Sequence, residues 1–419
     1  MKRFFSLVTA VSLLLVTGCS IPAFSNSVDN TTKQEAKEVS SNSAAPSPTS
    51  TNQPVSPPPP EPVAVDQRVT LMTVGDIMVH DEQLEAAWDT KSKSYQFQPF
   101  FAKVQPILKQ GDIVIGNLET TLAGADLRYS GYPEFNSPDS LATTLKQVGF
   151  TALTTANNHS LDRREKGVIR TLDALKRADL PSTGTFRTAE ERMQPMILEK
   201  NGVKLAVLAY SYGTNGIPLP KGKPYLVNLI QPALIKQDIA RAKLAGADIV
   251  AVALHFGNEY QRMPSDFQKK TANQCLVDGA DLIIGHHPHV VQPYEWRTVT
   301  LPDGKVKKGL IMYSLGNFIS AQRNDYKDIG AIAKITLLKD KNGTALVENA
   351  EIIPTYVHYY RQAGKRNYVI YPIAQTLQAR GKQNDPQLTL QVYRLLERYH
   401  KEMIVHVNKL IQTKKLASK

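Results

Sequence analysis

The chain has 419 residues, 42% of them hydrophobic and 21% charged, which is enough to bury a large core. The formal net charge is +12 at pH 7, but the basic residues are not interleaved with aromatic ones and form no zinc knuckle, which excludes the common nucleic-acid-binding modules. Two cysteines are present, Cys19 and Cys275, and no intramolecular disulfide is possible if Cys19 carries a lipid.

Residues 1–18 are predicted to be a lipoprotein signal peptide. Lys2 and Arg3 form the positively charged n-region of the signal peptide. The apolar stretch 4–16 is the h-region, and it is too short to cross a membrane as a stable helix. Residues 15–19 read Leu-Val-Thr-Gly-Cys and are similar to a bacterial lipobox, in which Cys19 is acylated. The two chains of such an anchor suffice for stable membrane attachment. The alternative is an ordinary secretory signal with an incidental cysteine.

Residues 19–67 are predicted to be a disordered, lipid-anchored linker. They are rich in Ser, Thr, Asn and Pro and contain few large apolar residues, so they cannot bury a core. A flexible coil of this length would hold the following domain roughly 40 Å from the membrane. The sequence therefore predicts an extracytoplasmic protein anchored to the membrane at the bacterial cell surface.

Residues 68–355 are predicted to form one α/β layered domain, because apolar strands alternate with helical segments before the chain ends in strands alone. Several strands are continuous apolar runs, which indicates that both faces of the sheet are covered. The expected strands are 69–74, 112–115, 150–155, 196–198, 204–210, 248–254, 281–284, 310–314, 329–338 and 346–353. The expected helices are 100–109, 140–148, 166–178, 232–245 and 263–278.

Residues 356–419 are predicted to be a basic, helical C-terminal region. They contain twelve Lys or Arg residues and three acidic residues, and 387–411 has helical spacing. Such a region on a tethered protein favours contact with an anionic surface, either lipid or wall polymer. The alternative is a solvated helix face.

Polar residues gather where the predicted strands end. In open α/β sheets, ligands bind outside the carboxyl ends of the strands, so these side chains are expected to converge. Carboxylate, amide and imidazole donors together suit Mn, Fe or Zn, and they outnumber the four ligands of a single zinc site. The pattern favours two ions bridged by a carboxylate. The residues are Asp76, Asn117, Glu119, Asn158, His159, His255, His286, His287, His289 and Asn317.

Each of these positions also has a structural alternative. The pairs 75–76 and 316–317 could be plain turns, Asn158 could cap a helix, and His255 could be a satisfied core histidine. The shared placement of the whole set at strand ends favours a site over these alternatives.

Six motifs carry a resemblance to a known family. They are Gly-Asp-Ile-Met at 75–78, Gly-Asn-Leu-Glu at 116–119, Asn-Asn-His-Ser-Leu-Asp at 157–162, His-Phe-Gly-Asn-Glu-Tyr at 255–260, Gly-His-His-Pro-His-Val-Val-Gln at 285–292 and Tyr-Ser-Leu-Gly-Asn-Phe at 313–318. Together they resemble the bacterial capsule (poly-γ-glutamate) synthesis family of the CapA type, which looks like a branch of the calcineurin-like metallophosphoesterases. The resemblance implies a layered, metallophosphatase-like β-sandwich flanked by helices.

The resemblance also implies site roles. The metal ligands would be Asp76, Asn117, Glu119, Asn158, His255, His287 and His289, holding one or two divalent ions (Mn, Fe or Zn). Met78 stands where the superfamily pattern has a histidine, and Asn117 replaces its bridging Asp, so Glu119 is expected to supply that carboxylate.

Catalysis is assigned by the same resemblance to His159 and Glu119, with His159 giving a proton to the departing oxygen. Glu259, Tyr260 and Arg262, on the loop after His255, and Asn317 are predicted substrate contacts. The alternative for the three loop residues is ordinary surface polarity.

The favoured function is a cell-surface lipoprotein of capsule biosynthesis, for poly-γ-glutamate or polysaccharide, with a metal-dependent phosphoesterase-like hydrolase site. The alternatives are a general extracytoplasmic metallophosphoesterase and a non-catalytic polymer-binding subunit with a structural metal site. The predicted partners are an anionic envelope polymer or a phosphate ester, the membrane through the lipid, and subunits of a polymer synthase, but no nucleic acid.

Overall fold

The computed structural model describes residues 65–362, 364–381 and 384–411. The predicted signal peptide, Cys19 and the linker as far as residue 64 lie outside the described residues. No described helix is long and apolar enough to cross a membrane. The described residues belong to one compact unit.

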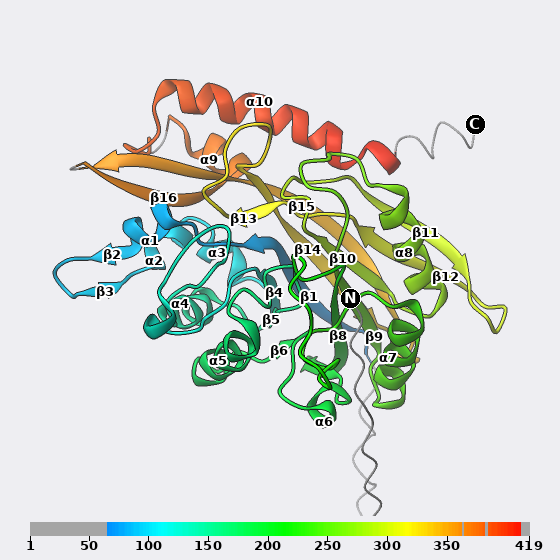
Figure 1. The fold of residues 1–419 in the computed structure, drawn as a ribbon. Helices are drawn as coiled ribbons and strands as arrows, with labels where there is room; N and C mark the ends of the chain where they lie inside the picture. The colour runs from blue at the N-terminus through cyan, green and yellow to red at the C-terminus, as the bar shows by residue number, and fades with distance from the viewer. Residues whose placement is uncertain (1–64, 363, 382–383, 412–419) are drawn as a thin grey trace, which may run out of the picture. The chain divides into compact units, whose positions relative to one another are not determined.

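The larger sheet has eight strands in the order β16-β15-β14-β1-β4-β5-β6, with β13 beside β1 (Figure 1). Strands β1, β4, β5 and β6 are parallel, and β14, β15 and β16 add antiparallel neighbours. Their bounds are β1 Gln67–Ile77, β4 Ile113–Leu118, β5 Ala152–Thr154, β6 Ser182–Thr183, β13 Asn317–Ile319, β14 Ile329–Lys339, β15 Ala345–Gln362 and β16 Lys365–Pro372.

The second sheet has six strands in the order β11-β12-β10-β9-β8-β7, and its four central strands are parallel. Its strands are β7 Met196–Lys200, β8 Val203–Ser211, β9 Ile249–His255, β10 Leu282–His286, β11 Tyr294–Thr300 and β12 Val306–Met312. A separate short hairpin joins β2 Trp88–Asp89 to β3 Ser94–Tyr95.

Helices lie outside both sheets, with α2 to α5 beside the first and α7 and α8 beside the second (Figure 1). The helices are α1 Asp81–Ala87, α2 Gln98–Phe101, α3 Gln105–Leu108, α4 Ser140–Val148, α5 Arg164–Arg177, α6 Ala189–Arg192, α7 Pro232–Leu244, α8 Asp266–Val277, α9 Ile373–Ala379 and α10 Leu390–Val407.

Alternation along the strands builds the layers. In β1, Leu71 packs into the core between the two sheets, whereas its neighbour Met72 packs into the core under α2 to α4. In β8, Leu205 faces the other sheet and Ala206 faces α7 and α8. Both sheets are therefore apolar on both faces, as predicted, and the layered α/β β-sandwich is confirmed.

Two expectations need correction. The helix expected at 100–109 is two short helices, α2 and α3, because Pro106 lacks an N–H and restarts the helix at its first turn. The boundary expected at residue 355 does not divide the structure, since β15 runs across it and pairs with β16. The C-terminal region therefore adds sheet strands as well as helices to the domain.

Helix α10 lies over the sheet rather than apart from it. Its Tyr393, Leu396, Tyr399, Met403 and Val407 recur at three- and four-residue intervals and are buried in the core that also contains β14 and β15. The basic residues predicted in this segment occupy the other face of the helix. The one free cysteine among the described residues, Cys275, is buried in α8.

Candidate metal centre

The polar residues predicted at strand ends are brought together by strand register. Asp76 in β1 pairs with Asn117 in β4 on one side and with Asn317 in β13 on the other. In the second sheet, His286 of β10 pairs with His255 of β9. Because these neighbouring strands are parallel, their carboxyl ends share one edge of each sheet.

Direct contacts join the two edges. The Asn117 side-chain amide donates to Asp76 Oδ1 at 2.9 Å and lies 3.3 Å from His255 Nδ1. The backbone N–H of His287 donates to Asp76 Oδ2 at 3.3 Å. The register of β1 shifts at Asp76 against both neighbours, and such bulges re-aim side chains at sites.

Asp76 is fully buried. Burial alone would raise its pKa, but contacts with two imidazoles outweigh burial and hold the pKa of Asp76 well below its usual range. The contacts are His286 Nδ1 to Oδ1 and His289 Nδ1 to Oδ2, both at 3.2 Å.

Glu119 lies directly after β4, and its environment, unlike that of Asp76, disfavours the charged carboxylate. It is fully buried, and neither carboxylate oxygen has a hydrogen-bond partner. Oε1 lies 3.4 Å from His255 Nε2 and 3.8 Å from His289 Nε2 without a hydrogen-bonding geometry. Burial, followed by the charge of Asp76, raises the pKa of Glu119 well above its usual value. Burying a carboxylate that has no hydrogen-bond partner costs free energy unless a bound cation compensates its charge.

Two imidazoles of the cluster, His255 and His287, have lowered pKa values, which favours their neutral form. Burial lowers the pKa of His255 well below its usual value, and burial together with the charge of His289 lowers that of His287 to about 3. His287 and His289 have positive φ angles of 96° and 57°, a strained conformation for non-glycine residues that persists mainly at functional sites. Neutral imidazoles are the form that binds metals.

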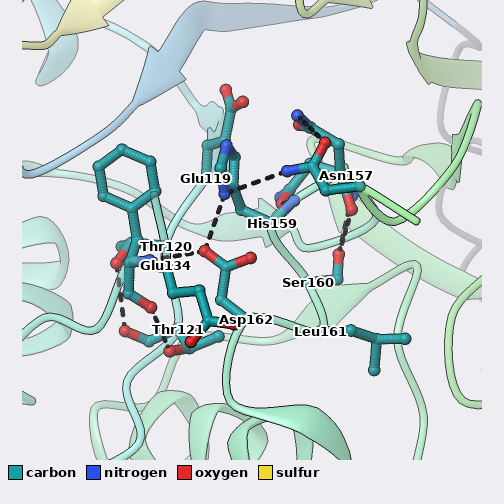
Figure 2. A network of polar contacts seen from close by, with 12 residues as sticks. Glu119, Thr120, Thr121, Glu134, Asn157, His159, Ser160, Leu161 and Asp162 are labelled. Atoms are coloured by element: carbon teal, nitrogen blue, oxygen red, sulfur yellow. Dashed lines mark hydrogen bonds and ion pairs between the residues drawn. The ribbon is translucent and has the colours of Figure 1, made fainter. Parts of the chain in front are cut away.

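The loop after β5 supplies a second group of polar residues. Asn158 Oδ1 lies 2.7 Å from His255 Nε2, which joins this loop to the cluster. His159 Nδ1 lies 2.8 Å from Asp162 Oδ2, and both side chains are buried. Figure 2 shows His159 beside Asp162, with Asn157 and Ser160 bonded within the same loop.

Two of the predicted substrate contacts lie at the rim of the cluster. Tyr260 is 45% exposed and its ring lies 6.2 Å from that of His289, and the exposed Glu259 is close enough to help raise the pKa of Glu119. Asn317 is instead fully buried: its Oδ1 lies 3.1 Å from His289 Nδ1, and it orients that ring. Because Asn317 is buried, its geometry fits a residue that positions His289 rather than one that contacts substrate.

Arg262 is not turned into the cluster. Its guanidinium lies 3.5 Å from the ring centroid of Tyr326 and donates to Met403 Sδ of α10 at 3.7 Å. The Met403 contact fastens the loop after β9 to α10, and the Tyr326 contact fastens it to the loop between β13 and β14. Packing therefore describes Arg262 better than either the predicted substrate contact or the alternative of ordinary surface polarity.

We expect Arg262→Ala to lower the free energy of unfolding by about 1–2 kcal/mol, through loss of the stacking contact and of the covered side-chain stem. Urea unfolding followed by circular dichroism measures this change. Arg262→Lys keeps the charge but not the planar stacking, so an intermediate loss is expected. An unchanged stability accompanied by a raised KM would contradict the packing role.

Sequence reasoning missed three neighbours of the cluster. The ring of Tyr212, which follows β8, lies 4.6 Å from the ring of His287 and is tilted 44° to it. Asn215 accepts a hydrogen bond from Asn158 at 3.0 Å, and Asp162 contacts His159. Asp162 is the last residue of the motif at 157–162, so that motif could have identified it. Tyr212 and Asn215 also follow a predicted strand, but no acidic residue or histidine next to them marked that strand end as part of a site.

The sequence model of the family described as bacterial capsule synthesis protein PGA_cap matches residues 70–322. The chain belongs to the PGA_cap family. It is 32% identical over 291 residues to the capsule biosynthesis protein CapA of Bacillus anthracis, covering 68% of this chain and 67% of that protein. It is 31% identical over 301 residues to the PGA biosynthesis protein CapA of Bacillus subtilis, covering 70% and 73%.

Solved structures are more distant from this PGA_cap chain. The calcineurin-like phosphoesterase YfkN from Bacillus subtilis is 16% identical, with a TM-score of 0.39 over 82% of this chain and 99% of that one. Its similarity supports no conclusion about activity. The capsule-family resemblance predicted from the six motifs is confirmed by the PGA_cap match.

The donors of this PGA_cap chain fit a divalent cation. Ligand atoms of Glu119, His287 and His289 lie within 4.8 Å of one another, and so do those of Asp76, Glu119 and His255. Both groups are buried and both include Glu119, the carboxylate that has no hydrogen-bond partner. His287 Nδ1 is likewise buried without a partner. The set of carboxylate and imidazole donors suits Mn, Fe or Zn.

Proposed function

We propose that this PGA_cap protein hydrolyses a phosphate ester at a site holding one or two divalent cations, in the synthesis of a capsule polymer. The observation that carries the proposal is the buried, unpartnered carboxylate of Glu119, shared by two groups of potential ligands. Membership in the capsule synthesis family supports the biological role.

The two ligand groups support the choice of metal-binding residues that we propose. The residues that would hold one or two divalent ions are Asp76, His255, His287, His289 and Glu119, the last being common to both groups. Asn158 Oδ1 lies against this set and is the further ligand we propose. Asn117, which was predicted as a ligand, presents its Nδ2 to Asp76 and His255, so we propose that it holds those side chains in place. When bound, divalent cations polarise a phosphoryl oxygen and lower the pKa of a bound water.

His159 is proposed as the proton donor to the leaving oxygen. Its Nδ1 faces Asp162, so its other nitrogen, Nε2, is free to act on a substrate. Asp162 Oδ2 also accepts the backbone N–H of Phe135 at 2.6 Å, which fixes the carboxylate in place. Asp162 therefore acts through His159 as a positioning residue.

We expect Asp162→Asn to lower kcat about 10²-fold, because an amide N–H facing Nδ1 forces the other tautomer of His159. KM and bound metal are expected to change little. Asp179→Asn, at an exposed carboxylate paired with Lys146, is the control. Kinetics on a chromogenic phosphodiester, with metal analysis of the same samples, measures both effects. A loss of metal equal to the loss of activity would contradict the positioning role.

The chain's place in the cell is part of the proposal. We propose that Cys19 carries a lipid, that residues 19–67 form a linker, and that the domain works outside the cytoplasm beside a polymer synthase. The outward face of α10 would meet an anionic polymer or lipid, since its exposed residues include Arg394, Arg398 and Lys401.

The decisive experiment begins with elemental analysis of the purified chain. The protein is then stripped with a chelator, reloaded separately with Mn and Zn, and assayed on the chromogenic phosphodiester. Bound metal and activity restored by reloading support the proposal. Bound metal without ester hydrolysis would favour a structural metal site in a polymer-binding subunit, and activity unaffected by chelation would refute a metal-dependent hydrolase.

A further inference from the structure

Three exposed tyrosines surround the metal centre. Tyr132 is 72% exposed, and Tyr212 and Tyr260 are each 45% exposed. They come from three separate loops, after β4, β8 and β9. Large aromatic side chains left open beside a buried polar centre indicate a binding surface.

Tyr212 and Tyr260 contact the cluster directly. The ring of Tyr212 lies 4.6 Å from that of His287 and stacks almost parallel to His255, at 10° and 6.4 Å. The ring of Tyr260 lies 6.2 Å from that of His289. Tyr260 has a φ of 63°, and its backbone N–H donates to Pro288 O at 2.8 Å, which fixes it against the histidine loop.

Tyr132 is linked to His159 through one further ring. It lies 6.4 Å from Phe135, whose ring stands edge-on to His159 at 4.6 Å. Tyr132 is also close enough to Tyr260 to contribute to the raised pKa of that phenol. Ring contacts therefore link all three tyrosines to the cluster or to His159 beside it, and each tyrosine remains largely exposed.

The charge around the tyrosines disfavours a polyanion. The exposed carboxylate of Glu259 contributes to the raised pKa of both Tyr212 and Tyr260. Lys327 Nζ lies 5.0 Å from the Tyr260 ring, but it is also 3.8 Å from Asp325. Repeated carboxylates along a polymer would meet the charge of Glu259, and Lys327, the cation beside Tyr260, is shared with Asp325.

Neutral hydrogen-bonding groups accompany the rings. The Gln322 amide donates to the Tyr260 hydroxyl at 3.4 Å, and the exposed Asn215 lies beside His159, with its Nδ2 3.5 Å from Nδ1. Aromatic faces combined with amides and phenols match an uncharged ring that carries hydroxyl groups: its C–H face packs on tyrosine and its hydroxyls bond to the amides.

We propose that Tyr132, Tyr212 and Tyr260 bind the sugar ring of a sugar phosphate, with its phosphoryl group directed into the buried cluster. This inference rests on the proposed function and names its substrate class. The tyrosines set specificity for the group attached to the phosphate, whereas the cluster holds the phosphate itself.

Calorimetric titration of the manganese-loaded full chain with glucose 1-phosphate and with inorganic phosphate tests this assignment. Glucose 1-phosphate is expected to bind at least about tenfold more tightly than phosphate. Tyr212→Ala and Tyr260→Ala should each reduce that ratio by about three- to tenfold, and Tyr132→Ala by less, while phosphate binding stays unchanged. Phenylalanine at each position should retain most of the ratio. Tyr359→Ala, at a tyrosine that is 42% exposed and contacts Tyr368, is the control.

Equal affinity for the two ligands, or an equal loss of both in the alanine variants, would overturn the assignment. Tighter binding of adenosine monophosphate than of glucose 1-phosphate would replace the sugar with a nucleobase and overturn it as well. Phosphate release is measured separately. Sugar-selective binding without phosphate release would contradict only the proposed hydrolysis. Phosphate release without sugar selectivity would contradict only the assignment of the tyrosines. If neither ligand binds, both fail.

Discussion

Replacing Glu119 with glutamine is expected to abolish metal binding and to lower ester hydrolysis at least about 10³-fold. The variant is nearly isosteric but removes the only carboxylate common to both ligand groups. A positively charged ion would then face a neutral amide at the position shared by the two groups. Metal content by elemental analysis and kcat on the chromogenic phosphodiester measure the two effects.

The same substitution should not destabilise the metal-free protein. Glu119 has no hydrogen bond to lose, and its pKa is raised by burial and then by the charge of Asp76. A carboxyl group with a raised folded-state pKa favours folding below its unfolded pKa and loses that contribution as pH rises through the folded value. The metal-free wild type should therefore lose stability relative to Glu119→Gln as pH rises above about 4.5, the ordinary pKa of a Glu.

Glu295→Gln is the matched control, because Glu295 is also buried but has partners. It accepts from the Tyr313 hydroxyl and from Arg297, both at 2.7 Å. This variant should keep its metal and lose about 1–3 kcal/mol of stability. A Glu119→Gln protein that retained stoichiometric metal, or that unfolded as easily as Glu295→Gln, would contradict the assignment of Glu119.

Substituting Gly285 with alanine is expected to cost at least about 3 kcal/mol of stability or to prevent folding altogether. A Cβ at this position would lie 1.9 Å from the carbonyl oxygen of Tyr313 and 2.7 Å from that of Met312. These are backbone atoms of the end of β12, so no side-chain rotation relieves the clash. Gly285 directly precedes the histidine loop, and its displacement would move His287 and His289 too.

Gly213→Ala is the control for this second experiment. A Cβ at Gly213 would meet no atom within 4 Å, and its φ is not positive. We expect a change below about 1 kcal/mol there. Soluble yield and chemical unfolding compare the two variants. A Gly285→Ala protein as stable as Gly213→Ala would mean that the backbone of β12 does not cross Gly285 as closely as described.

The strand ends were predictable because the signals are local. The apolar run before Asp76 and the run before His286 both read as buried strands, and the structure has β1 and β10 there. Polar residues directly after such runs must lie at a sheet edge. The strands β11 and β16 were missed, because Glu295 and Arg297 interrupt the apolar pattern of β11 and β16 follows a segment rich in charge. β11 and β16 form because each pairs with a neighbouring strand, which their own sequence pattern does not reveal.

The sequence alone predicted the layered α/β class and the list of donors at the strand ends from residue types and spacing, and its six motifs carried the resemblance to the capsule family that the PGA_cap match confirms. Only the tertiary structure decided how these donors are arranged. It placed Glu119 between His255 and His289 without a hydrogen-bond partner, turned Arg262 toward α10, and brought Tyr132 and Tyr212 to the rim. The physical reason is that strand order and loop path set distances between residues far apart in the chain, and no local pattern encodes those distances.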